Sequence, residues 1–534
     1  MCLKVQEPWP MPQETEKVGK AILKEESPYR LIGEKLFERF REQEYADLYS
    51  LEGKPGISPV VLAFVTVFQF MEKLPDRQAA ESLRMRMDWK YALRLPLAYE
   101  GFDYSVLSEF RDRLLEHEAE GRVFEQLVGE FRATGLIRER GRQRTDSIAM
   151  LMKVRRLSRL ELVVETLRLA VGASLKAERE WAEKVIPPSW EERYGERFVL
   201  QRHRREEWEE HDKHVGEDGQ WFLARVEGAG APAEIRSLPE VQVLKTVWAQ
   251  QFREAEGKIV YQAGTSYDGH TQIQTPHDPE ARYSRKRIQE WVGGKVQVTE
   301  TDDEGYPHII TDIAGTCSSR TDYEALSDIQ ERLAERDCLP GKQYVDSGYM
   351  SGPNLASSQE KRINLFGPPC PVVSNQSKLP NGITTDQFVI NIEKQIATCP
   401  AGFSAGLEYN REGKLRFRFP DEVCAGCSLR QRCCTGKRGR TICVGLTYPL
   451  LQEARKRQKT EAFKEEYHKH RSGVEGCLSA LARGNGMRLS RYTGNRKRHL
   501  QAVFSGSAAN LKRVAHWLAG ERPKRYHQPW GLPQ

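Results

Sequence analysis

The residues of this chain that could bind a divalent cation begin with Asp346. The apolar residues before it predict a short buried strand that ends at this carboxylate, and Gly348 permits a sharp turn just beyond it. A carboxylate at a strand end stands outside the sheet's own hydrogen bonds, on a rigid support, near where ligands of open α/β sheets collect. Most aspartates in such positions are solvated caps or turn formers, which is the simpler interpretation of this stretch alone.

Two further acids strengthen the case for a metal site. Residues 144–151 form a second strand-like stretch that contains Asp146, and residues 471–478 follow a helical pattern that contains Glu475. Arginines at alternating positions between 138 and 144 lead into Asp146, and in an extended chain they share its face. Clustered arginines favour the ionised form of a nearby carboxylate, and they also attract a phosphodiester.

Cysteines supply a second metal-binding pattern. One isolated thiol precedes a proline, a CxxC pair follows, and a fourth thiol comes soon after, which suits a tetrahedral structural zinc without a catalytic role. The predicted ligands are Cys399, Cys424, Cys427 and Cys433. Cys434 is an alternative to Cys433, and Cys370 is an outside candidate. Arginines and lysines between 430 and 440 suggest that this segment is pressed on DNA.

Length and composition limit the class of protein. A chain of 534 residues is too long for one ordinary core and suggests roughly three units. The longest apolar run, 60–70, is shorter than the ~20 residues that a membrane span needs, and residues 1–20 lack an apolar signal core. The 11 cysteines are few and clustered, which favours metal binding over disulfides and predicts a reducing cytoplasm.

The net charge of +7 is unevenly distributed. From Arg483 to the end, the chain has eleven Lys or Arg and one carboxylate, Glu521, with aromatic residues interleaved. Such a segment is typical of surfaces that contact phosphates and stack on bases, although a solvated basic helix explains the charges equally well. The candidate DNA-binding residues are Arg471, Arg483, Arg488, Arg491 and Lys497.

The elements that must position these residues follow from hydrophobic periodicity. Ser58-Pro59, Asp76 and Ser105 predict the starts of three helices in a compact N-terminal domain, possible as a helix-turn-helix variant but equally as a plain bundle. The second of these helices is expected to carry Met87. A long helical insertion from 157 to roughly 256 shows no chemistry and is interpreted as core or spacer.

Strand patterns then alternate with helices. Residues 294–300 and 308–313 predict two strands around an acidic turn at 302–305. A helix over 321–335 leads to the Asp346 strand, and a last strand is predicted at 363–366. Antiparallel strands, then alternating helix and strand, then an acid on a closing helix indicate a mixed α/β fold.

Several blocks of this sequence resemble the DDE insertion-sequence transposases, and within them the IS eleven-eighty-two-like group. The resemblance covers nearly the whole chain, including the cysteine segment. Its blocks are Asp76–Ala80, Asp88–Leu93, Phe102–Arg111, Arg144–Ser147, His277–Ser284, Val345–Tyr349 and Gly473–Gly476. Several such blocks in the right order are far more specific than any one of them.

The resemblance implies an α/β fold with an RNase H-like mixed-sheet catalytic core, an all-α N-terminal domain and an inserted zinc-ribbon-like module. The expected divisions are a helical DNA-binding domain at 1–135 and the first part of the core at 136–369, with the helical insertion at about 157–256. A cysteine-rich module at 370–446 and closing helices with a basic tail at 447–534 would follow.

The resemblance also implies an activity. Asp146, Asp346 and Glu475 would hold two Mg²⁺ ions, replaceable by Mn²⁺, about 4 Å apart. Water would free a 3′ hydroxyl at the element's end, and that hydroxyl would attack target DNA. The implied partners are double-stranded DNA at terminal inverted repeats and at the target, and a second copy of the chain in a homodimer. The expected location is the nucleoid in the cytoplasm, without a membrane.

One departure from the family pattern concerns the last helix. Related transposases carry Tyr, Arg, the catalytic Glu and Lys there at fixed spacing. Arg471 stands four residues before Glu475, on its helical face, but Tyr467 is one residue too far away. Ala482 occupies the Lys position, next to Arg483.

Two alternatives remain open at the level of sequence. A catalytically inactive, transposase-derived DNA-binding protein would keep the helical domain and the zinc module, although the three intact acids argue against it. A recombinase with a covalent Tyr or Ser nucleophile would need a supporting Arg/His/Tyr constellation, and none is recognisable in the sequence.

Overall fold

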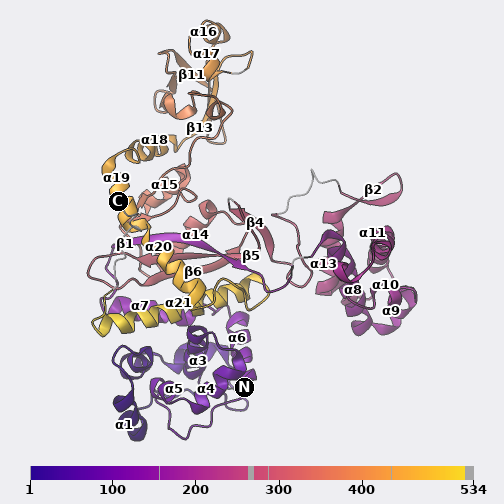
Figure 1. Cartoon of the computed structure of the whole chain (residues 1–534), viewed down its shortest axis with the longest axis vertical. Coiled ribbons are helices and arrows are strands. Elements are labelled where there is room, and N and C mark those ends of the chain that lie inside the picture. The colour runs from indigo at the N-terminus through magenta and orange to yellow at the C-terminus, as the bar shows by residue number, and fades with distance from the viewer. Residues whose placement is uncertain (1, 156, 263–269, 287, 435, 523–534) are drawn as a thin grey trace, which may run out of the picture.

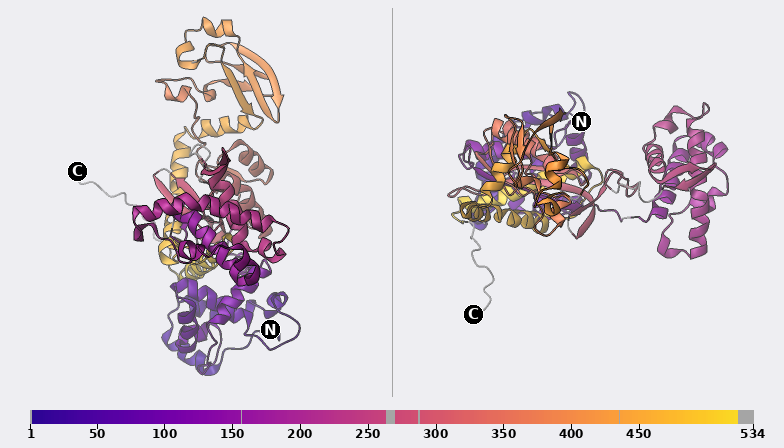
Figure 2. Two further views of the ribbon diagram at one scale, coloured as in Figure 1. Left: turned by 90° about the vertical axis from the view of Figure 1, so that its right-hand side faces the viewer. Right: turned by 90° about the horizontal axis from the view of Figure 1, so that it is seen from above.

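The computed structural model describes residues 2–155, 157–262, 270–286, 288–434 and 436–522. A central sheet lies between an N-terminal helical layer and a smaller β-sheet module at the opposite end, and a helical lobe projects to one side (Figure 1). Two further views show the same separation of the lateral lobe and the end module from the central body (Figure 2).

The N-terminal layer is built around one helix that is buried on all sides. Helix α3 (Pro59–Glu72) begins with a proline after Ser58, whose hydroxyl accepts a hydrogen bond from the Val61 N–H at 3.5 Å. The starts predicted at Asp76 and Ser105 are also observed, in α4 (Asp76–Met85) and α6 (Ser105–Glu116). The second predicted helix is shorter than expected, because extended backbone at Arg86 separates α4 from α5 (Met87–Ala92).

The central sheet is mixed. Its strands are β1 (Arg142–Leu151), β4 (Arg282–Lys286), β5 (Gln289–Thr301), β6 (Ile310–Cys317), β7 (Lys342–Tyr344) and β8 (Asn364–Phe366). The order is β5–β1–β7–β8, and β4 and β6 pair with successive parts of the outer edge of β5. The pairs of β5 with β1, β4 and β6 are antiparallel, whereas β1, β7 and β8 run parallel. The predicted mixed α/β fold is therefore confirmed.

The long helix α21 (Asn495–Leu518) joins the sheet to the N-terminal layer. It packs against β6 on one side and against α3 and α7 (Arg122–Ala133) on the other. Phe504 of α21 stacks on Phe70 of α3, with ring centroids 5.8 Å apart. The N-terminal helices, the sheet and α21 consequently share one hydrophobic core.

Helices also cover the acid-bearing part of the sheet. They are α14 (Asp322–Glu335), α15 (Gly352–Glu360), α19 (Glu461–Arg471) and α20 (Gly473–Ser479). Helix α14 begins with a capping box, in which Thr321 and Glu324 satisfy each other's backbone N–H groups. Helix α20 lies against β1, and α19 lies against β7.

The lateral lobe contains the predicted helical insertion. Its main helices are α8 (Arg159–Ala177), α11 (Arg205–Glu227) and α13 (Pro239–Gln251), with the shorter α9 (Arg179–Val185), α10 (Trp190–Tyr194) and α12 (Ala233–Ser237). A β hairpin formed by β2 (Phe252–Ala255) and β3 (Lys258–Tyr261) follows, which the sequence did not predict. Val164, Phe222 and Trp248 belong to a hydrophobic core of the lobe's own.

The cysteine-rich segment forms an antiparallel sheet in the order β13–β12–β11–β10–β9. Its strands are β9 (Val389–Asn391), β10 (Ile396–Thr398), β11 (Ser404–Arg411), β12 (Lys414–Arg418) and β13 (Thr441–Gly445). Two short helices, α16 (Asp421–Ala425) and α17 (Arg430–Cys433), lie between β12 and β13, and α18 (Tyr448–Arg457) leads back to α19. This module has a separate core that includes Phe388, Phe417 and Ile442. Within the described residues, no helix has the length and apolar character needed to cross a bilayer.

Candidate active site

The register of two parallel strands brings Asp146 and Asp346 together. Strand β1 pairs with β7 so that Arg144 lies opposite Tyr344. Asp146, within β1, and Asp346, just beyond the end of β7, each come two residues after this pair, and adjacent strands are about 4.8 Å apart, so the two carboxylates lie close together. Asp346 lies just beyond β7 and not within it, and its Oδ1 accepts a hydrogen bond from the Gly348 N–H at 2.8 Å.

The electrostatics of this pair disfavour two bare negative charges. Burial and the neighbouring Asp146 carboxylate raise the pKa of Asp346, and Lys286 opposes the shift. The Lys286 Nζ is 3.7 Å from Asp346 Oδ2. Two carboxylates that share a partly desolvated site are stabilised by a cation, which is the condition that a metal-binding pair must meet.

A protein cation already contacts Asp146. Arg471 Nη2 donates to Asp146 Oδ2 at 2.6 Å, and Asp146 is only 8% exposed. Burial lowers the pKa of Arg471, but the Asp146 carboxylate more than offsets burial, so the pKa of Arg471 is raised. The guanidinium of Arg471 therefore acts as the counter-ion of Asp146.

Arg144, two residues before Asp146, has a different role from the one predicted. Arg144 is buried, and it donates to Glu300 Oε1 at 2.7 Å and to Asp302 Oδ1 at 3.0 Å. Because these internal acids satisfy its guanidinium, Arg144 does not present a charge to a phosphodiester. Asp302, predicted to lie in a turn, is buried as part of this ion-pair network.

Glu475 lies on the helix that packs over β1, but the predicted continuous helix is interrupted. Helix α19 ends at Arg471 and α20 begins at Gly473, and Arg471 is buried whereas Glu475 is exposed. The expected common helical face is therefore not formed. Gly473 permits the close approach of α20 to β1, because a Cβ there would lie 2.0 Å from Arg144 Nη1. In the part of the chain that the structure describes, no three His, Cys, Asp or Glu side chains are arranged to hold a metal.

Asp322 is a third acid beside the pair that sequence reasoning missed. Its Oδ1 accepts from Lys295 Nζ at 3.2 Å and from Gln297 Nε2 at 3.1 Å. Burial raises its pKa, but these two partners outweigh burial, so the pKa of Asp322 is lowered. A Cβ at Gly348 would lie 3.0 Å from Asp346 Oδ1 and 3.3 Å from Asp322 Oδ2, which shows how closely the two carboxylates approach.

The buried Tyr349 completes this cluster. Its hydroxyl donates to Gln297 Oε1, and burial together with Asp322, Asp146 and Asp346 raises its pKa well above the ordinary value. The only sequence signal for this arrangement is the alternation of Lys295 and Gln297 on a predicted strand, which places their side chains on one face. Which acid that face meets depends on contacts that sequence spacing does not encode.

The cations expected to bind DNA lie in different environments. Arg483 and Arg488 are exposed, whereas Arg471 is buried against Asp146. Arg491 Nη1 donates to the Leu74 carbonyl at 3.0 Å, and Lys497 Nζ is 3.1 Å from Asp112 Oδ1. The side chains of Arg491 and Lys497 therefore contact the N-terminal layer.

The predicted zinc ligands gather at one place in the cysteine-rich module. Cys399, Cys424, Cys427 and Cys433 line the same small cavity, of about 30 Å³, together with the alternative ligand Cys434. Burial raises the pKa of Cys433 to about 11. Cys370 does not line this cavity and instead donates from its Sγ to the Ser347 carbonyl at 3.1 Å. The thiols are neighbours, although the described residues do not adopt the geometry of a formed metal site.

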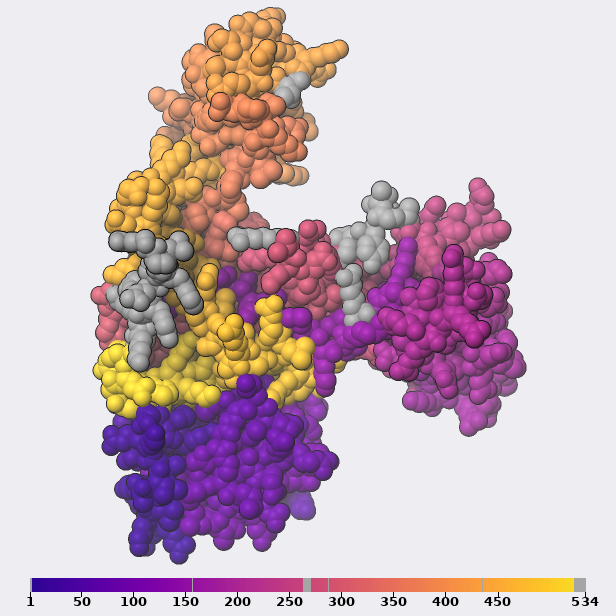
Figure 3. All heavy atoms as spheres, viewed as in Figure 1, coloured from indigo at the N-terminus to yellow at the C-terminus, as the bar shows by residue number. Residues whose placement is uncertain are grey.

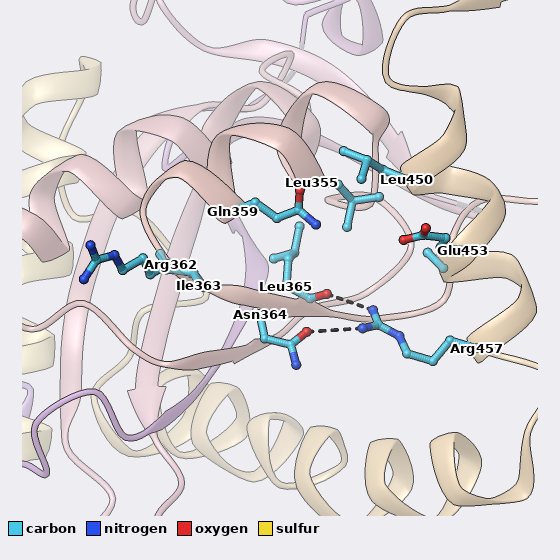
Figure 4. Close-up of a pocket in the computed structure, with 10 residues that line it drawn as sticks. Leu355, Gln359, Arg362, Ile363, Asn364, Leu365, Leu450, Glu453 and Arg457 are labelled. Carbon is cyan, nitrogen blue, oxygen red and sulfur yellow. Dashed lines mark hydrogen bonds between the residues drawn. The ribbon is translucent and has the colours of Figure 1, made fainter. Parts of the chain in front are cut away.

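A larger cavity, of about 530 Å³, lies at the outer edge of the central sheet (Figure 4). Helices α15 and α18 and strand β8 surround it, and Arg457 donates across it to the Leu365 carbonyl and to Asn364 Oδ1. None of the candidate acids or thiols lines this cavity. Its size therefore does not identify it as the site of chemistry.

The mixed sheet, with one aspartate within β1 and one just beyond the neighbouring parallel strand β7, fits the class of RNase H-like catalytic cores. Residues 398–515 match a family model described as Transposase DDE domain, and residues 17–113 match one described as Transposase domain (DUF772). These two matches support a DNA transposase of the DDE class. The DDE match contains Glu475 but not Asp146 or Asp346. Neither the curated proteins nor the solved structures contain a significant match.

Proposed function

We propose that this chain is an insertion-sequence transposase of the IS eleven-eighty-two-like group. It cuts the element's terminal inverted repeats by metal-dependent hydrolysis and joins the resulting 3′ hydroxyl ends to target DNA. The observation that carries the proposal is that the parallel strands β1 and β7 bring Asp146 and Asp346 together, in a chain that matches two transposase domain models. Two copies would act together, because an element has two ends to process.

Asp146, Asp346 and Glu475 are the proposed ligands of Mg²⁺, with Mn²⁺ as a substitute. The two aspartates fit such ions because they offer adjacent hard oxygen donors and because the pKa of Asp346 reflects repulsion that a cation relieves. Bound divalent ions would activate the attacking oxygen and stabilise the leaving one. Glu475 is exposed on α20, which packs against β1, so it is available to join the pair.

The protein's own residues prepare this site in two ways. Arg471 keeps the buried Asp146 carboxylate paired, and it must release Asp146 Oδ2 when that oxygen takes a metal ligand's role. Lys286 lies beside Asp346 and is 55% exposed at its side chain, so it can transfer its contact to a DNA phosphate. Both cations thereby balance charge before and after DNA enters.

The direct test is the variant Asp346→Asn. It removes charge from the metal site and keeps the side chain's shape, so purified variant should bind an element-end duplex normally and lose Mg²⁺-dependent 3′ hydroxyl cleavage. Asp337→Asn is the matched control, since Asp337 is exposed and has a positive φ that asparagine tolerates. Full cleavage by Asp346→Asn would contradict the assignment of Asp346 as a metal ligand.

We also propose one structural zinc per chain, held by Cys399, Cys424, Cys427 and Cys433. The support is that all four thiols line one cavity. The raised pKa of Cys433 means that its thiol is protonated at neutral pH without metal, so zinc binding should release protons and weaken as pH falls. Metal analysis of freshly purified, reduced protein should find one zinc, and Cys427→Ser should lose it. Zinc-free wild-type protein would refute this site.

A further inference from the structure

The β4–β5 hairpin exposes a large apolar side chain at its tip. Ile288 is 92% exposed, and the neighbouring Lys286, Gln289 and Glu290 are also exposed. Isolated exposed apolar residues are common on proteins, so exposure alone carries no conclusion. What distinguishes Ile288 is its neighbour Lys286, which contacts the candidate acid Asp346.

The base of the hairpin is firmly held. Ser284 pairs with Trp291 in the ladder, both residues are buried, and the Trp291 indole N–H donates to the Gly294 carbonyl at 3.2 Å. Met152, Ala281 and Val292 form a small apolar cluster below the tip. Strand β6 takes over the edge of β5 from Gly294 onward, so the hairpin tip extends past the pairing of the central sheet. A rigid base can hold the tip in one place against a ligand.

The tip stands beside the acid pair. Lys286, the last residue of β4, has its Nζ 3.7 Å from Asp346 Oδ2, and Ile288 is two residues further along the turn. Figure 3 shows a broad hollow between the cysteine-rich module, the central body and the lateral lobe, and strands β4 and β5 reach its border in Figure 1. A DNA end bound at the candidate acids would therefore lie close to Lys286 and to this tip.

We infer that the β4–β5 hairpin is a DNA wedge, in which Ile288 inserts between the bases next to the scissile phosphate while Lys286 contacts the backbone. This inference rests on the proposed function. Apolar wedges flanked by cations are a recurrent means of unstacking a base step, because the side chain replaces the lost stacking and the cation holds the phosphate. Opening the end would give the acid pair access to the strand that is cut.

The first experiment measures unstacking without cleavage. In an Asp346→Asn background, an element-end duplex carries 2-aminopurine at the base next to the scissile phosphate, and its fluorescence should rise on binding. Adding Ile288→Ala should abolish the fluorescence rise. The variant should still fold, because an exposed side chain contributes little to stability, and binding should stay within about twofold, because the lost insertion is offset by the base step that no longer has to be unstacked. The control is Leu51→Ala, at another exposed apolar residue. Leu51 is 99% exposed, and its replacement should leave the fluorescence signal unchanged.

The second experiment asks whether a pre-opened substrate replaces the wedge. With the native Asp346, Ile288→Ala should cut a fully paired end about tenfold or more slowly, since unstacking a step costs a few kcal/mol. An end with two unpaired terminal bases should restore cleavage to the wild-type rate. Unchanged fluorescence and cleavage in Ile288→Ala would overturn the wedge, as would a slow variant that unpaired bases fail to rescue. Failure of wild-type protein to cut any substrate, with the fluorescence rise intact, would instead count against the proposed chemistry and keep the wedge.

Discussion

At the scale of single residues, the candidate site is a balance of buried charges. Asp146 is paired with Arg471, and Asp322 is held by Lys295 and Gln297. Asp346 has the most distant cationic partner of the three, Lys286 at 3.7 Å, and its pKa is raised. A carboxylate in that condition has the most to gain from an added cation.

Asp346 should make the metal-free protein less stable as pH rises. Its folded pKa lies above its ordinary value of 3.8, so the folded state holds more protons between the two values and stability falls across that window. Each unit of difference removes about 1.4 kcal/mol at neutral pH. Asp346→Asn should therefore raise Tm at pH 7, by an amount that vanishes below pH 3.8. A lower Tm for this variant at pH 7, without metal, would contradict the direction of the shift.

Arg471 should compete with metal at Asp146. Arg471→Met leaves a buried carboxylate without its counter-ion, which costs about 3–5 kcal/mol. Mg²⁺ should recover part of that loss, so the increase in Tm on adding Mg²⁺ should be larger for Arg471→Met than for wild type. Arg483→Met, at an exposed position, serves as the control. Equal Mg²⁺ responses in all three proteins would show that Arg471 does not stand in for metal.

The residues of the site could be predicted from the sequence only where a local pattern determines their position. Asp146, within a strand pattern, and Asp346, at the end of one, could be singled out because a strand pattern is local. Arg471 is 325 positions from its partner Asp146, and Asp322 is 27 and 25 positions from its partners Lys295 and Gln297. Such pairings depend on how the helices dock, and no spacing rule encodes them.

At the scale of elements, the loop at 277–280 caps the N-terminus of α21. Asp278 is buried, and its carboxylate accepts from the Gly494 N–H at 3.1 Å and from Arg498 Nη1 at 2.5 Å. Glu280 accepts from the Asn495 N–H. The first N–H groups of a helix have no partner within the helix, so these acids cap α21 from a distant part of the chain. His277 adds a contact to Glu165 of the lateral lobe, at 2.8 Å.

Breaking the Asp278–Arg498 ion pair should destabilise the central body. Asp278→Asn removes the charge that pairs with Arg498 and should lower the free energy of unfolding by about 3–5 kcal/mol, measured by urea denaturation. Arg498→Met should be similarly costly, and the double variant should cost clearly less than the two losses added together. Strict additivity would show that the two side chains do not act as a pair.

The elements themselves were predicted best where a start signal is local. Prolines and capping residues fixed the beginnings of α3 and α14, and alternating apolar residues fixed β5 and β6. The interruptions at Arg86 and Ser472 were missed, since the apolar pattern continues through both. There, packing against α3 or against β1 overrides the helical periodicity.

At the scale of the whole molecule, the segments that differ in net charge also belong to different hydrophobic cores. Residues 447–534 contain 18 Lys or Arg and 6 acids, whereas residues 159–262 contain 16 Lys or Arg and 20 acids. Helices α19, α20 and α21 of the first segment pack on the central body, and the second segment forms the lateral lobe with its own core. The lobe was predictable as an insertion. The shared core of α3 and α21 was not, because Phe70 and Phe504 are distant in sequence.

This division predicts which parts fold and bind alone. A fragment of residues 157–262 keeps the whole of α8 through β3 and nearly all of its core, so it should unfold cooperatively and show helical circular dichroism. A fragment of residues 1–135 exposes the face of α3 that α21 covers, including Phe70, and should be poorly folded or aggregate.

The same lobe fragment should not bind DNA, because its net charge is negative and polyanion binding depends on released counterions around Lys and Arg. Full-length protein should bind an element-end duplex with an affinity that falls steeply between 50 and 200 mM salt, as expected for about 6–10 phosphate contacts. Deleting residues 159–262 and joining the ends by a flexible linker should leave that salt dependence unchanged. A flatter dependence after deletion would mean that the acidic lobe orders a basic surface elsewhere, and the lobe would then belong to the DNA interface.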